Sequence, residues 1–142
     1  MNKSVLVLAA FLFLTPLATH PLWQRLDDTL PGDVGDPVLN ASILAWDAHE
    51  LITDPAHLFD SGFYYPLPFA LAYTENLLGS ALLGLPVSLL TGQPALTYNV
   101  VFLLSFVLTG FGMYLLLLRI TRSRPAAFVA GVAFAFAPYH LA

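Results

Sequence analysis

The amino-acid sequence predicts an all-α integral membrane protein with about three transmembrane helices and a large outer loop that contains interfacial helices. Of its 142 residues, 58% are hydrophobic and only 10% are charged, and the mean hydropathy is +0.75. This composition is typical of membrane proteins. Apolar runs lie toward both ends of the chain, whereas all nine acidic residues lie between Asp27 and Glu75. We therefore expect a first span over 1–23, an outer loop over 24–93, and a second and third span over 94–142.

The first apolar run extends from Val5 to Leu17 and is preceded by Lys3. A run of this length also fits the core of a signal peptide. The exit from the run, residues 15–21, offers no good small-x-small cleavage site, and Trp23 can anchor a helix at the membrane interface. We interpret this region as an uncleaved first span, or signal anchor, with its N-terminus in the cytoplasm.

The outer loop is expected to contain an acid-rich helix that begins at Asp36. The Asp36 carboxylate can accept hydrogen bonds from first-turn amides, and Pro37 at the first helical position has no amide to lose. At about 100° per residue, one face then combines Ile43 with polar residues. Those polar residues are Asp36, Asn40, Asp47 and Glu50. We expect this face to point toward water or a cavity, with the opposite side in a membrane interface; the simpler alternative is a helix cap followed by a solvated helix face.

The topology follows from charge and from the number of spans. The run from Leu96 to Leu118 has more than twenty residues without a charge, which is enough to cross a bilayer. The basic loop 119–125 follows and is expected in the cytoplasm. If residues 77–90 also crossed, this basic loop would lie outside, so we expect them to form an interfacial or re-entrant helix. The aromatic segment 63–69 suits the depth of the lipid headgroups.

The third span is expected after Pro125. Gly131 and the alanines between positions 126 and 135 form a small-residue surface suited to close helix packing. The chain ends within or just past this span, so we expect it to be a fragment of a longer protein.

Carboxylate side chains are the main candidates for metal binding or catalysis in the sequence. The chain has no cysteine, glycine-rich phosphate loop or zinc motif. The separation of acidic from basic residues indicates topology, not a nucleic-acid partner. The acids of the loop suit Mg²⁺ or Mn²⁺ beside a phosphate, or a general base that takes a hydroxyl proton. They are Asp33, Asp36, Asp47, Glu50 and Glu75.

The order of these features resembles the GT-C membrane glycosyltransferases, and within that superfamily most of all the YfhO-like bacterial membrane proteins. The residues that carry the resemblance are Gly35-Asp36-Pro37-Val38-Leu39-Asn40, Trp46-Asp47-Ala48, Phe63-Tyr64-Tyr65-Pro66, Ala72-Tyr73-Thr74-Glu75-Asn76-Leu77-Leu78-Gly79 and Ala133-Phe134-Ala135-Phe136-Ala137-Pro138-Tyr139. The Asp36-Pro37-x-x-Asn40 piece is also similar to the first-loop motif of the oligosaccharyltransferase catalytic subunit.

The resemblance implies the N-terminal part of a multi-pass enzyme of the cytoplasmic membrane, with residues 24–93 outside. The whole enzyme would transfer a sugar from a polyprenyl-phosphate donor, a lipid-linked partner, to an acceptor at the outer face. Asp36 would then be a catalytic or metal-binding carboxylate, and Glu75 a second acid beside the active cavity. Asp33 and Asp47 are further candidate ligands for Mg²⁺ or Mn²⁺. This part alone is not expected to catalyse transfer.

A non-enzymatic membrane protein is the alternative class. A transporter subunit or assembly factor of this kind would use its acidic loop to bind a partner or a cation. Transporters place ionisable residues within their spans, and the span over 96–118 has none. This difference favours the enzyme.

Overall fold

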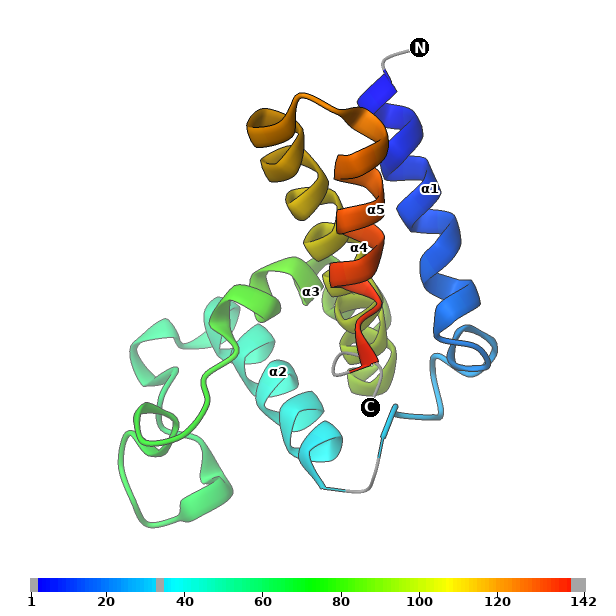
Figure 1. Cartoon of the computed structure of the whole chain (residues 1–142). Helices are drawn as coiled ribbons and strands as arrows, with labels where there is room; N and C mark the ends of the chain where they lie inside the picture. The colour runs from blue at the N-terminus through cyan, green and yellow to red at the C-terminus, as the bar shows by residue number, and fades with distance from the viewer. Residues whose placement is uncertain (1–2, 33–34, 139–142) are drawn as a thin grey trace. The chain divides into compact units, whose positions relative to one another are not determined.

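The structure, a computed structural model, describes residues 3–32 and 35–138. Regular secondary structure in these ranges is entirely helical, which confirms the all-α class. The α-helices are α1 (Lys3–Ala18), α2 (Asp36–Thr53), α3 (Leu78–Thr91), α4 (Pro94–Thr121) and α5 (Arg124–Ala135) (Figure 1). Short 3-10 turns lie between them: η1 (Leu22–Gln24), η2 (Pro55–His57), η3 (Gly62–Tyr64) and η4 (Ala70–Ala72).

The chain divides into two compact units. The terminal unit consists of Met1–Arg25 and Phe102–Ala142, and the central unit is Leu26–Val101. Helix α4 therefore contributes its first two turns to the central unit and the rest of its length to the terminal unit. Each unit has its own buried residues.

The terminal unit is built around the ring of Phe11, which is fully buried between helices. Its neighbours in this core include Val107 and Tyr114 of α4 and Ala127 and Ala135 of α5. A Cβ atom added at Gly131 would lie 2.7 Å from the carbonyl oxygen of Gly110. The backbones of α4 and α5 are thus in close contact. Of the predicted small-residue surface, Ala127, Gly131 and Ala135 are buried in this packing, whereas Ala126 and Ala133 are exposed.

The central unit is held together by packing of α2 against α3. Ala41, Leu44 and Ala48 of α2 are buried, as is Ala81 of α3. A Cβ atom added at Gly84 would lie 2.8 Å from Cγ2 of Thr97, so α3 also lies directly against the start of α4.

Helices α3 and α5 bury small side chains and expose large ones. Residues buried in α3 are Ala81 and Gly84, whereas Leu82, Leu83, Leu89 and Leu90 are exposed. Likewise α5 buries Ala127, Gly131 and Ala135, and exposes Val129 and Phe134. This distribution is the reverse of the one expected for helices that pack around a water-soluble core.

Helix lengths agree in part with the expected spans. Within the described ranges, α4, with 28 residues, is the one helix long and apolar enough to cross a membrane. Helices α1, α3 and α5 are apolar but have 16, 14 and 12 residues. The basic segment 119–125 is largely helical and not a loop, because α4 continues to Thr121 and α5 begins at Arg124.

Candidate functional site

The expected acidic helix begins at Asp36, as predicted, but Asp36 is not its cap. Gly35 occupies the N-cap position and offers no side-chain hydrogen bond, while Pro37 lies in the first turn. The Asp36 carboxylate is exposed in that turn. An acid there interacts favourably with the positive end of the helix dipole. Its oxygens are accessible to a ligand.

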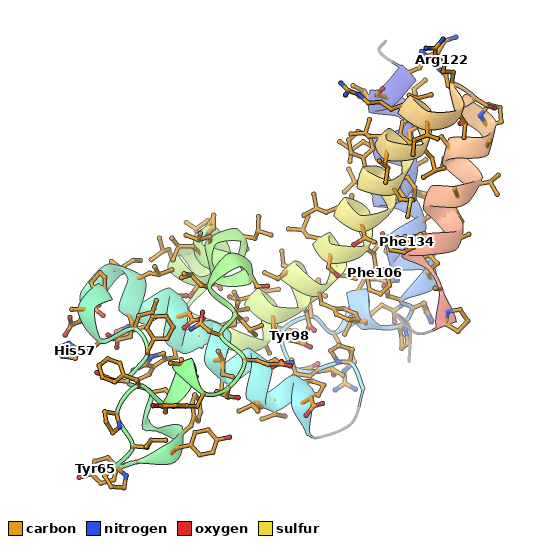
Figure 2. All side chains as sticks on the ribbon, turned by 60° about the vertical axis from the view of Figure 1, so that its left-hand side comes forward. His57, Tyr65, Tyr98, Phe106, Arg122 and Phe134 are labelled. Carbon is orange, nitrogen blue, oxygen red and sulfur yellow. The ribbon has the colours of Figure 1, made fainter. Side chains whose placement is uncertain are left out.

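Tyr98 is a residue on which the charge of Asp36 acts. It lies in the first turns of α4, half-buried, and the charge of Asp36 acts on its phenol group. Figure 2 shows Tyr98 beside α2. Sequence reasoning missed this residue because it lies at the edge of a long apolar run. A signal was present, since three polar residues, Thr97, Tyr98 and Asn99, interrupt the start of that run.

Asn99 fixes the segment that leads to Asp36. Its side chain is completely buried, and its Nδ2 atom donates hydrogen bonds to the carbonyl oxygens of Leu26, at 2.8 Å, and Thr29, at 2.7 Å. Further along this segment, Gly32 has a φ of +84° and packs near Pro37. Asn99 therefore ties the start of α4 to residues 26–29, in the segment that precedes α2.

Asp47 lies in a different environment from Asp36. It is 0% exposed, and its Oδ1 atom accepts a hydrogen bond from Asn76 Nδ2 at 3.3 Å. Its Oδ2 atom has no hydrogen-bond partner among residues 3–32 and 35–138. Burial raises the pKa of the Asp47 carboxyl, although the Leu77 amide and the Asn76 side chain act in the opposite direction.

The expectation that the polar face of α2 points toward water or a cavity is wrong for Asp47 and Glu50. Both are buried, together with Ile43 on the same face. These residues are buried because a segment distant in sequence covers them. The residues before α3 fold back over this face of α2, and the Asn76 side chain donates a hydrogen bond to Asp47. The side expected to be apolar and interfacial exposes Val38 and Ile52.

The structure does not gather the four candidate site residues in one place. Asp36 and Asp47 are eleven positions apart on α2, or about 16 Å along the axis at 1.5 Å per residue. They cannot share one ion, because Mg²⁺ binds oxygen at about 2.0–2.1 Å. Glu75 is exposed and adjacent to Asn76, so it lies near the middle of α2. Asp33 lies outside the described residues.

No group of three or more histidine, aspartate or glutamate residues with metal-binding geometry occurs in the described part of the chain. Among the described residues, Asp36 is the carboxylate that would bind a metal ion at the start of α2, with water or a substrate phosphate as further ligands. Mg²⁺ is commonly bound in this way, through one or two carboxylates and phosphate oxygens.

A cleft of about 370 Å³ lies between α2 and the second half of α3. Most of its lining is apolar, and its polar members are His49, Thr53 and Ser88. The full lining comprises Ala45, Ala48, His49, Ile52 and Thr53 of α2, Ser88 and Leu89 of α3, and Gly92 and Pro94. His49 is exposed and lines this cleft.

Charge is completely separated between the two units. The central unit contains all nine acidic residues and no lysine or arginine, whereas the terminal unit contains all five basic residues and no acid. Their formal charges are therefore −9 and +5, with histidine counted as neutral.

Comparison of the chain with protein-family models, with curated proteins and with solved structures gives no match.

Proposed function

We propose that this chain is the N-terminal part of a GT-C type membrane glycosyltransferase. The enzyme transfers a sugar from a polyprenyl-phosphate donor to an acceptor at the outer face of the cytoplasmic membrane. The observation that carries the proposal is the exposed Asp36 carboxylate, whose charge acts on Tyr98, in an acidic unit joined to a helix of membrane-spanning length.

The burial pattern of α3 and α5 supports a membrane location. Lipid tails are as apolar as leucine, so helices in a bilayer gain little by burying leucine and instead pack through small residues. Helices α3 and α5 follow this rule. Helices shorter than the hydrocarbon thickness are accommodated by local thinning of the bilayer. The basic residues Lys3, Arg119, Arg122 and Arg124 support a cytoplasmic N-terminus and a cytoplasmic α4–α5 connection, with residues 24–93 outside.

In this proposal Asp36 activates the acceptor. The carboxylate takes the proton of an acceptor hydroxyl as its oxygen attacks the anomeric carbon of the donor. The bond between that carbon and the phosphate oxygen breaks, and its electron pair leaves with the polyprenyl phosphate. Tyr98, on which the charge of Asp36 acts, would donate a hydrogen bond to the acceptor or to the phosphate, and Asn99 would hold the carbonyl groups of Leu26 and Thr29 in the segment before α2. A bound Mg²⁺ or Mn²⁺ would counter the phosphate charge.

Asp36→Asn in the full-length protein tests this role. Because Asp36 is exposed and is not the cap, losing its charge should cost only about 0.3–1 kcal/mol of helix stability. Loss of a general base lowers rates by about 10²–10⁴. We expect sugar transfer from radiolabelled polyprenyl-phosphate sugars in membranes to fall by this factor.

Asp54→Asn is the matched control, because Asp54 is another exposed acid of the central unit whose described ion pair is with His57. It should keep transfer near wild type. Transfer by Asp36→Asn within a few-fold of wild type would contradict the catalytic role of Asp36.

The non-enzymatic alternative is favoured by one observation, the formal charge of −9 on the central unit. A unit with this charge attracts cations or a basic partner electrostatically and needs no catalytic activity to do so. Under this alternative, wild type and Asp36→Asn would both lack transfer with every donor, and calorimetric Mg²⁺ binding would fall only slightly for each single acid removed.

A further inference from the structure

The cleft between α2 and α3 has the size and lining of a ligand site. Pockets for small molecules are commonly about 300–1,000 Å³ and mostly apolar, with a few polar groups. This cleft measures about 370 Å³ and is lined by Ala45, Ile52 and Leu89 among other apolar residues. It does not include Asp36, so it is a separate site.

The charge of the surroundings narrows the ligand class. The central unit contains no lysine or arginine to pair with a phosphate or carboxylate placed in the cleft. The ionisable residue in the lining is His49, whose Nε2 atom lies 4.0 Å from Glu50 Oε1. The Thr53 hydroxyl already donates to the His49 carbonyl oxygen at 2.9 Å. These features favour an uncharged, mostly hydrocarbon ligand.

The residues next to the cleft indicate that such a ligand would come from a membrane. Leu89 lines the cleft and is 63% exposed, and the next residue, Leu90, is 86% exposed. Helix α3 has no charged residue, and only Gly92 and Gln93 separate it from α4, the helix of membrane-spanning length. The apolar lining thus continues into exposed leucines within a few residues of the candidate span.

We propose that the cleft binds one hydrocarbon chain of a membrane lipid, with the lipid headgroup remaining outside the cleft. The chain lies against Ala45, Ile52 and Leu89, and it covers apolar surface that the central unit otherwise leaves open. This proposal rests on the membrane location given under the proposed function and does not depend on sugar transfer.

Photo-crosslinking in reconstituted liposomes tests the site. The probe is a phosphatidylcholine with a diazirine at the end of one acyl chain, incorporated with the full-length protein and mapped by peptide mass spectrometry. We expect crosslinks in residues 45–53 and 88–94. A polyprenyl phosphate with a diazirine on its isoprenoid chain is the second arm, and stronger competition by one lipid identifies the source of the chain.

Two variants separate cleft binding from general contact with the bilayer. Leu89→Glu places a charge in the cleft and should abolish the crosslinks in 45–53. Leu82→Glu places the same charge on an exposed part of α3 outside the cleft lining and should keep them. Ala45→Trp, which fills the cleft with a ring, should abolish them without adding a charge.

Retention of the 45–53 crosslinks in both Leu89→Glu and Ala45→Trp would overturn the proposal. So would crosslinks confined to exposed residues of α4, such as Leu108 and Leu116, although the membrane location would then stand. Absence of crosslinks from α4 as well would contradict the membrane location itself.

Discussion

Asp47 shows how burial decides what a carboxylate can do. Its folded-state pKa is raised above the ordinary value of 3.8, mainly by burial. Its contribution to stability is therefore fully present below the unfolded pKa and is lost as the pH rises through the folded pKa. At neutral pH the buried, half-paired carboxylate opposes folding.

We predict that Asp47→Asn is more stable than wild type at pH 7. Asparagine keeps the Oδ1 acceptor for Asn76 and has no charge to desolvate. Thermal unfolding in detergent across a pH series checks this, and the advantage of the variant should shrink as the pH falls toward 4. A variant less stable than wild type at pH 7 would mean that the charge of Asp47 is used, and would restore it as a cation ligand.

His57 is a second residue whose pKa is shifted in the folded protein. Its Nδ1 atom lies 2.8 Å from Asp54 Oδ2, and this contact raises the pKa of the imidazole. The favourable interaction is fully present below the unfolded pKa of about 6.5 and is lost as the pH rises through the folded pKa. We predict that Asp54→Asn lowers the pKa of His57 in an NMR titration. Asp60→Asn should lower it less, and equal effects of the two variants would contradict the assigned pair.

Sequence periodicity placed Asp47 and Glu50 on one face of α2, but it could not show what covers that face. The covering contact comes from Asn76, 29 residues after Asp47. The rule that polar residues face water therefore failed at these positions. Tyr98 and Asn99 were missed for a related reason, because their importance depends on Asp36 and on the carbonyl oxygens of Leu26 and Thr29.

Local signals predicted the helix ends well. The Asp36-Pro37 start of α2 is confirmed. Helix α3 ends at Thr91, one residue beyond the expected 77–90, and its cap Gly92 has a φ of +63° as a left-handed cap requires. The end of α4 and the start of α5, both within the basic segment 119–125, were predicted less well. Arginine favours helix formation and does not itself end a helix. Close packing of α5 through Gly131 was predictable from its small residues, whereas Phe11 as its partner was not.

Two glycines of α4 provide a matched test of this packing. A Cβ atom at Gly110 would lie 2.7 Å from Phe11 Cδ1 and 3.0 Å from Ala135 Cβ, whereas one at Gly112 meets nothing within 4 Å. We predict that Gly110→Ala destabilises the protein by about 1–3 kcal/mol, the usual cost of overpacking. Gly112→Ala should be neutral or stabilise it by up to about 1 kcal/mol. Equal unfolding temperatures of the two variants would contradict the packing of α1, α4 and α5.

At the scale of the whole molecule, composition and charge predicted an all-helical chain with its acids separated from its bases. The all-α class is confirmed. Membrane insertion and the number of spans stay predictions. Among the described helices α4 is long and apolar enough to cross a membrane, whereas α1 and α5 reach only 16 and 12 residues. Hydropathy along a sequence reports how apolar a run is, whereas caps and bends set the length of the helix.

The side of the membrane on which each unit lies is the most direct test of the account. The chain has no cysteine, so single cysteines report one position each. Ala56 of the central unit, Gln93 before α4 and Ser123 after α4 are all exposed. In intact cells, a membrane-impermeant thiol reagent should label Ala56→Cys and Gln93→Cys, and should label Ser123→Cys only after permeabilisation. Labelling of Ser123→Cys but not Ala56→Cys in intact cells would contradict an outer acidic unit, and different results at positions 56 and 93 would mean that α3 crosses the membrane.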